Sequence, residues 1–453
     1  MSTVNTTHKA CTVNPLKLSQ PVGGALAFLG LEGCMPLLHG SQGCTAFGMV
    51  LFVRHFRESV PLQTTAMSEV ATVMGGLENI GKAILSIHQR AKPKVIGICS
   101  TGVTETKGDD VDGYLKTFMA EHTELGDLQV VYVSTPDFKD AFQDGWGKAV
   151  SQIIQSLAEP RVPVVTGAVN FLVGSHLTVA DIEELRDLSE AFGLKPTILP
   201  DLSGSMDGHI PDDFSPITLG GTSLDAIRNL GSAELTIAVG EQMRPAAEML
   251  MARTGQSYVL FDRLTGLEPN DQLLDCLSQI SGRPVPLKYR RQRSQLMDAM
   301  LDSHFFFGGK KIAIGAEPDL LWTLATWLTE MGAEIAAAVT TTHSPLLEQM
   351  PCNEVLIGDL EDLENRALGC DLLITTSHGR QAAERLHIPF VRMGLPIFDR
   401  LGATHRMSVG YRGTRDLLFE VGNLLMAHEH ENHPDSWPLP EAYHAARSPL
   451  ALS

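Results

Sequence analysis

The residues best suited to carry chemistry lie in a turn that follows an apolar run near the N-terminus. The run Cys-Met-Pro-Leu-Leu (residues 34–38) leads into His39-Gly40-Ser41-Gln42-Gly43, and Cys44 stands where the next helix should begin. The two glycines permit backbone angles and close approaches that other residues do not. A cysteine at a helix N-terminus lies near the positive end of the helix dipole, which favours the thiolate that iron–sulfur clusters need as a ligand. The alternative is a structural turn with a small buried thiol.

A single cysteine cannot hold such a cluster, because iron–sulfur sites normally take about four cysteine ligands. No C-x-x-C pair occurs, and the seven cysteines are scattered along the chain: Cys11, Cys34, Cys44, Cys99, Cys276, Cys352 and Cys370. If Cys44 is a ligand, the others must come from another chain, so the site would lie at a subunit interface. The odd, scattered set also argues against a disulfide framework and fits a reducing compartment.

Polar residues gather at a second place, after an apolar run in the last third of the chain. The loop Thr-Thr-Ser-His-Gly-Arg (residues 375–380) is followed closely by Arg-Met-Gly-Leu-Pro-Ile-Phe-Asp-Arg (residues 392–400). Ligands of open α/β sheets bind at the carboxyl ends of the strands, so either segment could line a cavity for an anionic ligand. The alternative is an ordinary loop with a surface ion pair.

The elements that must position these residues alternate between short apolar runs and longer helical stretches. Several runs are apolar at consecutive positions, which is typical of strands buried on both faces of a parallel sheet. The predicted strands are residues 94–99, 129–133, 163–169, 235–240, 311–315 and 371–376, and clear helical patterns cover residues 179–188 and 320–328. Thr178 is a plausible N-cap of the first of these helices, and Gly332 lies near the end of the second.

Repeated βα units predict an α/β fold of three Rossmann-like, doubly wound domains with mainly parallel sheets. The length of 453 residues agrees with this at ~150 residues per domain. We place an N-terminal α/β domain carrying Cys44 at residues 1–160, a middle Rossmann-like domain at 161–296 and a C-terminal one at 297–427. Residues 428–453 are polar and rich in His and Pro, and we expect them to form a C-terminal extension.

Composition excludes several classes of function. The formal charge of −18 argues against nucleic acid as the main partner, because phosphate binding needs a cationic face. No segment reaches the ~18 apolar residues of a membrane span, and the N-terminus lacks the regions of a signal peptide. No G-x-G-x-x-G follows a predicted strand and no P-loop pattern occurs, so dinucleotide or ATP binding is unsupported. We therefore expect a cytoplasmic protein.

Four N-terminal motifs make the chain recognisable as a whole. His-Gly-Ser-Gln-Gly-Cys (39–44), Arg-His-Phe-Arg-Glu (54–58), Gly-Gly-Leu-Glu-Asn (75–79) and Ser-Thr-Gly-Val-Thr-Glu-Thr-Lys-Gly-Asp-Asp (100–110) resemble the nitrogenase component 1 family on its β-subunit side. Met-Leu-Asp-Ser-His (300–304), Ala-Glu-Pro-Asp (316–319) and residues 394–400 resemble the third domain of that family. The resemblance spans nearly the whole chain and implies three Rossmann-like domains.

The resemblance also locates the cluster ligands. Catalytic β subunits of the family give three cysteines to a larger cluster, at positions that fall here on Ser19, Cys44 and Gly102. Only Cys44 keeps a thiol, which is the pattern of the family branch that assembles the iron–molybdenum cofactor. That branch implies a [4Fe–4S] cluster between two subunits, with Cys44 as the single ligand from this chain and three cysteines from the partner. Cys99 is interpreted as a core thiol, because it ends a predicted strand three residues before Gly102.

For function, the resemblance implies a scaffold subunit without turnover of its own. It would pair with a NifE-type subunit in an α2β2 heterotetramer and help to mature a cofactor precursor that the partner mainly holds. NifB would donate that precursor, the Fe protein NifH would dock and deliver molybdenum and homocitrate, and apo-nitrogenase would accept the product. Two alternatives stay open: a catalytic β-type subunit of a nitrogenase or of a dark-operative tetrapyrrole reductase, and a Rossmann-type nucleotide-sugar transferase that needs no iron.

Overall fold

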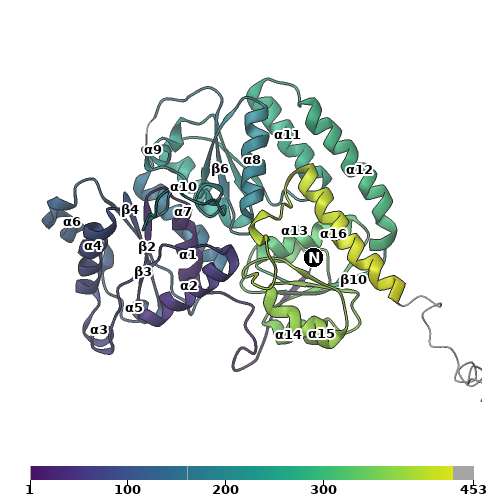
Figure 1. Ribbon diagram of the computed structural model, residues 1–453, viewed down its shortest axis with the longest axis horizontal. Helices are drawn as coiled ribbons and strands as arrows, with labels where there is room; N and C mark the ends of the chain where they lie inside the picture. The colour runs from purple at the N-terminus through teal and green to yellow at the C-terminus, as the bar shows by residue number, and fades with distance from the viewer. Residues whose placement is uncertain (1, 161, 432–453) are drawn as a thin grey trace, which may run out of the picture.

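Three parallel sheets form the framework of the computed structural model, which describes residues 2–160 and 162–431 (Figure 1). The strands come from apolar runs that helices cover on both faces; β2 (Cys34–His39) and β4 (Val95–Ser100) are buried at every position. Apart from the N-terminal strand β1, each sheet comes from a different part of the chain, and the three units lie around a common junction. This confirms the predicted α/β class with three Rossmann-like units.

The first sheet has the order β3-β2-β4-β5, and every strand pair in it is parallel. In register, His39 at the end of β2 lies beside Ser100 at the end of β4, so the two following loops leave the sheet side by side. The further strands and the helices of this unit are β3 (Gln63–Thr64), β5 (Gln129–Val133), α1 (Gln20–Leu29), α2 (Gln42–Phe56), α3 (Glu69–Met74), α4 (Leu77–Ala91), α5 (Gly102–Glu105), α6 (Val111–Glu121) and α7 (Phe142–Leu157).

The second sheet has the order β7-β6-β8-β9 and is again wholly parallel. The strand predicted at residues 163–169 is wrong in its position, because β6 covers Ala168–Val173. Val164 and Val165 are exposed and precede the ladder instead of joining it. The other elements are β7 (Lys195–Leu199), β8 (Leu235–Val239), β9 (Tyr258–Phe261), α8 (Val179–Ala191), α9 (Leu224–Arg228), α10 (Arg244–Thr254) and α11 (Leu267–Ser281).

The third sheet has six strands in the order β1-β12-β11-β10-β13-β14. Its edge strand β1 (Thr3–Thr6) comes from the opposite end of the chain and pairs in parallel with β12, so the N-terminus lies in the third unit (Figure 1). The other elements are β10 (Lys311–Gly315), β11 (Glu334–Thr340), β12 (Glu354–Ile357), β13 (Leu372–Thr375), β14 (Phe390–Arg392), α12 (Leu287–Phe307), α13 (Pro318–Glu330), α14 (Leu360–Arg366), α15 (Arg380–Leu386) and α16 (Gly410–Glu431).

The domain boundaries predicted from the sequence stay predictions. Three elements, namely β1, α12 and α16, do not keep to them. Strand β1 adds residues of the first predicted domain to the third sheet, and helix α12 runs across the boundary at 296. Residues 428–431 of the predicted C-terminal extension end helix α16, while 432–453 lie outside the described residues. No helix within the described part of the chain is long and apolar enough to cross a membrane.

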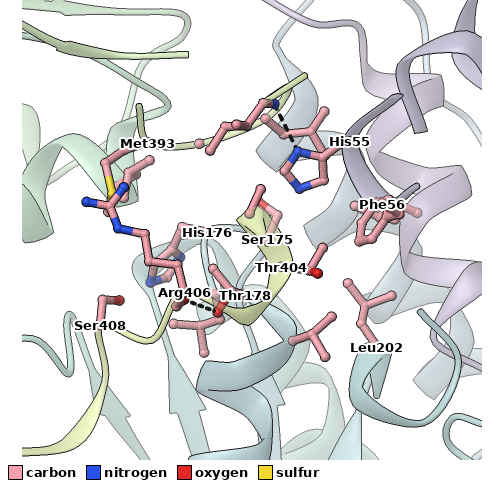
Figure 2. A pocket seen from close by; sticks show the side chains of 18 residues that line it. His55, Phe56, Ser175, His176, Thr178, Leu202, Met393, Thr404, Arg406 and Ser408 are labelled. Atoms are coloured by element: carbon pink, nitrogen blue, oxygen red, sulfur yellow. Dashed lines mark hydrogen bonds between the residues drawn. The ribbon is translucent and has the colours of Figure 1, made fainter. Parts of the chain in front are cut away.

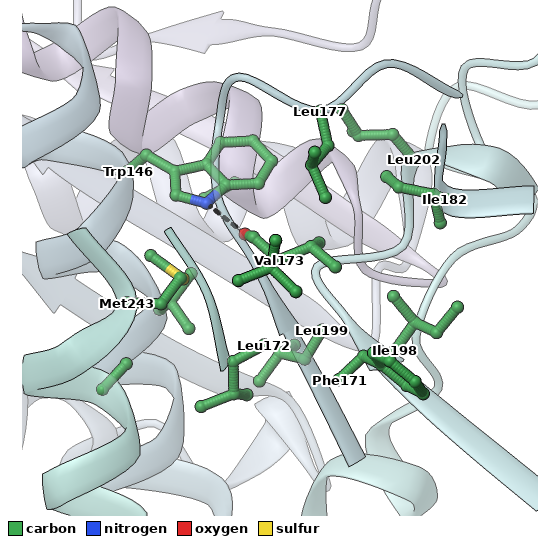
Figure 3. Packing of buried hydrophobic residues seen from close by; sticks show 14 of the residues in the cluster. Trp146, Phe171, Leu172, Val173, Leu177, Ile182, Ile198, Leu199, Leu202 and Met243 are labelled. Atoms are coloured by element: carbon green, nitrogen blue, oxygen red, sulfur yellow. Dashed lines mark hydrogen bonds between the residues drawn. The ribbon is translucent and has the colours of Figure 1, made fainter. Parts of the chain in front are cut away.

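A continuous hydrophobic core joins the first two units, so they are not independent bodies. Helix α1 is buried at every residue and crosses α7 where a Cβ on Gly23 would collide with the Phe142 carbonyl. Trp146 of α7 then reaches the second sheet, where its indole Nε1 donates to the Val173 carbonyl at 2.8 Å among Phe171, Leu172 and Met243 (Figure 3). The carboxyl ends of the first two sheets are thus held in a fixed relation.

Candidate functional site

The predicted turn lies between strand β2 and helix α2, and it places Cys44 in the first turn of the helix. Ser41 is the N-cap, but its side chain makes no capping hydrogen bond; its Oγ lies 3.5 Å from the Cys44 Sγ instead. Gln42 and Gly43 are exposed, and Cys44 is half-buried. A Cβ on Gly43 would have only the Ser41 Oγ near it, at 3.9 Å. The thiol therefore stands at an uncapped helix N-terminus with open space beside it.

His39 and Gly40 form the buried base of this turn. The His39 side chain is fully buried, and burial lowers its pKa to about 4, so the imidazole is neutral at physiological pH. Its Nδ1 lies 3.1 Å from the Thr65 hydroxyl, while among the described residues nothing partners its Nε2. At Gly40 a Cβ would collide with the Thr101 side chain, so glycine is required by close approach here. His39 thus shapes the turn from below and does not reach solvent.

The resemblance puts two further ligand positions of the larger family cluster at Ser19 and Gly102, and neither residue has a thiol. Ser19 is the N-cap of α1 and makes no capping hydrogen bond. Gly102 is buried at the start of α5, where a Cβ would collide with the Asp137 carboxylate. Cys99 lies fully buried in the core, where a Cβ on Gly24 would collide with its Sγ, and burial raises the pKa of its thiol. Cys44 is therefore the accessible thiol at this end of the sheet.

Exposed apolar side chains lie on helix α2, which carries Cys44, and on helix α3, whose preceding loop is bonded to the turn. On helix α2, Phe47 is 64% exposed and Val50 52% exposed, one and two turns beyond Cys44. Helix α3 buries none of its residues, and it presents Val70, Val73 and Met74 to solvent. This helix is attached directly to the turn, because the Met67 amide donates to the Gly40 carbonyl at 3.0 Å. An apolar surface of this kind around a functional residue is typical of a protein–protein contact.

The loop at residues 375–380 and the segment at residues 392–400 both line small cavities at the junction of the three units, through Thr376 and through Met393, Gly394 and Leu395. Arg392 is not free for an anion, because it donates to the Asp399 Oδ2 at 2.9 and 2.8 Å. The pair is mostly buried instead of lying on the surface, and Ser377 donates to the other Asp399 oxygen at 2.5 Å. The Ile397 amide donates to the His55 Nδ1 at 2.9 Å. This segment thus ties the third unit to helix α2.

A small cavity lies where the three units meet (Figure 2). It has a volume of about 60 Å³ and adjoins a second cavity of about 30 Å³. His55 and Phe56 enter it from α2, Ser175 and His176 from the loop after β6, and Met393 from the loop after β14. Burial lowers the pKa of both His55 and His176 to about 4. Of the described residues that line the two cavities, none is a cysteine.

Buried carboxyl groups of the Ala-Glu-Pro-Asp motif (residues 316–319) join the units close to this junction, through contacts that the motif itself did not indicate. Burial raises the pKa of Glu317 to about 8 and that of Asp319 to about 6. The Gln143 amide donates to Glu317 at 3.2 Å, and both the backbone and the side-chain amide of Gln242 donate to Asp319 at 3.0 Å. These residues lie far apart in sequence, so no local spacing could reveal the network.

The metal-ligating side chains of this chain fit one ligand position of a cluster and not all of them. Across residues 2–160 and 162–431, no three His, Cys, Asp or Glu side chains are grouped so that they could hold a metal ion. An accessible thiol at an uncapped helix N-terminus can still ligate iron, since thiolate is the ligand of such clusters and the helix dipole favours negative charge there. Completing the coordination of a cluster at Cys44 therefore requires ligands from a second chain.

Comparison with known proteins adds the family context of this site. The family model described as "Nitrogenase component 1 type Oxidoreductase" matches residues 19–426. The chain is 60% identical to the nitrogenase iron-molybdenum cofactor biosynthesis protein NifN of Bradyrhizobium diazoefficiens, over 96% of this chain and 95% of that protein. It is 50% identical to the protein of the same name from Nostoc sp., over 94% and 96% of the two chains. Among solved structures, "Nitrogenase Cp1 at pH 6.5" is 30% identical, with a TM-score of 0.89 over 96% of this chain and 98% of that one.

Proposed function

The chain belongs to the nitrogenase component 1 family, and from this premise we propose that it is a scaffold subunit for assembly of the iron–molybdenum cofactor of nitrogenase. The observation that carries the proposal is the half-buried thiol of Cys44 at the start of α2, because the resemblance puts Ser19 and Gly102, which have no thiol, at the two companion positions. The names of the most similar relatives support it, since they describe cofactor biosynthesis and not substrate reduction. The subunit would act in the cytoplasm and have no turnover of its own.

Cys44 would supply one ligand to a [4Fe–4S] cluster shared with a NifE-type partner, which would supply three cysteines. Such a cluster, when bound, provides a low-potential electron-transfer or structural centre between the subunits. The chain's own residues would shape its side of the site. The uncapped amides at the start of α2 would face the negative charge of the cluster, and Gly43 would leave room for the cluster. The turn of His39, Gly40, Ser41 and Gln42 would form the wall beneath it.

The exposed apolar side chains near Cys44 would be divided between two protein partners. Phe47 and Val50 lie on the same helix as the cluster ligand, so the NifE-type subunit that shares the cluster would cover them in the α2β2 heterotetramer. Helix α3 projects from the first unit (Figure 1) and would give this chain's half of the docking surface for the Fe protein NifH. Docking there would bring the delivery of molybdenum and homocitrate close to the shared interface.

The cofactor precursor would be held mainly by the partner and not by this chain. The junction cavity of about 60 Å³ is far smaller than the ~300–1,000 Å³ of typical cofactor pockets. Three open pockets of about 500, 600 and 630 Å³ fall within that range, but no described residue that lines them or the junction cavity is a cysteine. This chain would contribute part of the wall of the maturation site. The precursor would come from NifB, and the finished cofactor would pass to apo-nitrogenase.

The experiment is to purify the chain anaerobically with its partner and to assay the complex in two ways. We expect it to activate nitrogenase that lacks its cofactor, given the Fe protein, molybdate, homocitrate and precursor, while reducing little or no acetylene itself. Robust acetylene or dinitrogen reduction by the complex would instead establish a catalytic β-type subunit, and protochlorophyllide reduction would establish the tetrapyrrole branch. A colourless, iron-free complex that transfers a sugar from a nucleotide would overturn the scaffold proposal altogether.

A further inference from the structure

Three threonine hydroxyls hold the peptide that joins strand β2 to the Cys44 turn. The Gly40 amide donates to the Thr65 Oγ1 at 3.0 Å, and that hydroxyl also lies 3.1 Å from the His39 Nδ1. On the other side, the Thr101 Oγ1 donates to the His39 carbonyl at 2.9 Å, and the Thr104 Oγ1 lies 3.2 Å from the same oxygen. All three threonines are buried. The peptide is therefore held from both neighbouring loops.

These side chains replace the sheet ladder at the point where it stops. The β2–β4 register ends at His39 and Ser100, and β3 pairs with β2 only at Leu37 and Leu38. A buried backbone group left without a partner would cost about 1–3 kcal/mol, and the hydroxyls prevent this. The Thr104 Oγ1 also lies 2.9 Å from the Thr101 carbonyl oxygen, and its one hydrogen points better to that closer acceptor, so Thr101 is the main donor to the His39 carbonyl.

The arrangement is rigid below the turn and open above it. Thr101 fills the space beside Gly40, and the Met67 amide holds the Gly40 carbonyl at 3.0 Å. Above this base, Ser41 leaves the first amides of α2 uncapped, and Cys44 is half-buried at the surface. The orientation of the first turn of α2, and with it the direction of the Cys44 Sγ, is thus set by the peptide that the threonines hold.

Resting on the proposed cluster at Cys44, we propose that Thr65 and Thr101 are positioning residues that fix the Cys44 thiolate and the α2 amides relative to ligands from a second chain. A cluster shared by two chains needs its fourth sulfur at a defined place, which a loosely held turn cannot provide. The uncapped amides carry the positive end of the helix dipole, and this favours the reduced, more negative form of a cluster. Loosening the peptide should therefore lower the reduction potential of the cluster.

The test compares two pairs of variants in the complete complex: Thr101→Val with Thr101→Ser, and Thr65→Val with Thr65→Ser. Valine keeps the shape of threonine and removes the hydroxyl, whereas serine keeps the hydroxyl. Iron, acid-labile sulfide, the EPR spectrum of the reduced cluster and its midpoint potential are measured for each. We expect the valine variants to show altered g values and a more negative midpoint potential or a lost cluster, and the serine variants to match the wild type.

Several results would overturn the positioning role. Valine variants with wild-type g values and potential would do so, as would serine variants that shift as far as the valine ones. If both valine variants fail to assemble with the partner while both serine variants assemble, the hydroxyls serve folding only. Failure of the underlying cluster assignment is recognised separately, because the wild-type complex would then hold no interface cluster or the Cys44→Ala complex would retain it.

Discussion

The Cys44 turn and the three-unit junction both lie at carboxyl ends of parallel strands, yet they differ in what they leave open. At the turn, the base is buried and held, while the thiol, the α2 amides and the apolar residues of α2 and α3 face outward. At the junction, side chains from all three units close on a cavity of about 60 Å³, and buried carboxyl groups are held by amides. The proposed function has a partner protein complete the Cys44 site, whereas the junction is closed by side chains of this chain.

This difference indicates that the open turn, and not the packed junction, is the better place for a ligand in this chain. Strand ends are the usual ligand sites of α/β folds, but the junction here is packed with Leu320, Met393 and Leu395. Its polar groups serve to join the units. At the turn, by contrast, the α2 amides are uncapped, and the thiol and apolar side chains are exposed, so a partner protein can bury them. Two results would contradict this difference: substitutions at the junction that leave stability unchanged, or substitutions at the turn that leave the cluster unchanged.

The largest effect on stability is expected from removing the Asp319 carboxylate. Asp319→Ala leaves the backbone and side-chain amides of Gln242 without their buried acceptor. We expect the free energy of unfolding to fall by about 3 kcal/mol, because each lost bond to a charged group costs about 1.5–3 kcal/mol. Denaturant unfolding measures this, with Asp319→Asn as the control that keeps an acceptor oxygen. A loss below about 1 kcal/mol for the alanine variant would mean that the junction is not held as described.

Gly40→Ala should have the next largest effect, at the turn. The added methyl group collides with Thr101, whose hydroxyl holds the His39 carbonyl, so the peptide or the threonine must move. We expect a loss of about 1–3 kcal/mol in the free energy of unfolding and a disturbed or missing cluster. Gly43→Ala is the matched control for stability only, because its Cβ would enter the open space beside Ser41 that the cluster is proposed to use. An unchanged cluster spectrum in the Gly40 variant would contradict the close approach that defines the turn.

The junction should also impose a pH dependence through Glu317. Burial raises its pKa from 4.5 to about 8, so the folded protein binds this proton more tightly than the unfolded chain does. Its contribution therefore favours folding below pH 4.5, and that advantage is lost as the pH rises towards 8. Glu317→Gln should raise the free energy of unfolding by about 1–2 kcal/mol at pH 8 and by little at pH 5. Parallel stability curves for the variant and the wild type would refute this.

The smallest effect on stability is expected on helix α3. Val73 is 75% exposed, and Val73→Ser should change the free energy of unfolding by less than about 0.5 kcal/mol. If α3 receives the Fe protein, the same variant should weaken docking by about tenfold, as loss of about 1.4 kcal/mol would do. Leu368→Ser is the control, because Leu368 is 70% exposed on the third unit. Equal docking affinities for both variants and the wild type would remove α3 from the docking surface.

Much of the fold follows from apolar runs, and the exceptions have identifiable causes. Strand β5 and strand β10 occupy the residues predicted, since continuous apolar runs bounded by polar residues admit little else. The predicted strand at 163–169 is displaced, because the apolar residues Val164 and Val165 are exposed before the ladder and the strand continues through the polar Asn170. Asn170 is buried within β6, where its amide donates to the Leu230 carbonyl at 2.7 Å. Strand β1 is polar and carries no pattern of its own, and it forms because the edge of β12 pairs with it.

The candidate site was predictable only in part. The turn and its cysteine follow from local spacing, because the glycines, the helix start and the thiol lie within six residues. The hydroxyls of Thr65 and Thr101 that hold the turn come from other loops and are isolated in the sequence, so no pattern links them to His39. The Arg392–Asp399 pair was visible as a motif, but its burial against helix α2 depends on the packing of the first unit on the third.

The central claim is that this chain gives one ligand, Cys44, to a cluster completed by its partner. The most direct measurement is the iron, sulfide and EPR signal of the anaerobic complex carrying Cys44→Ala, compared with the wild type and with Cys99→Ala. We predict that the Cys44 variant loses the signal of the shared [4Fe–4S] cluster while the two subunits still associate, and that the Cys99 variant keeps it. An intact cluster signal in the Cys44→Ala complex would contradict the account.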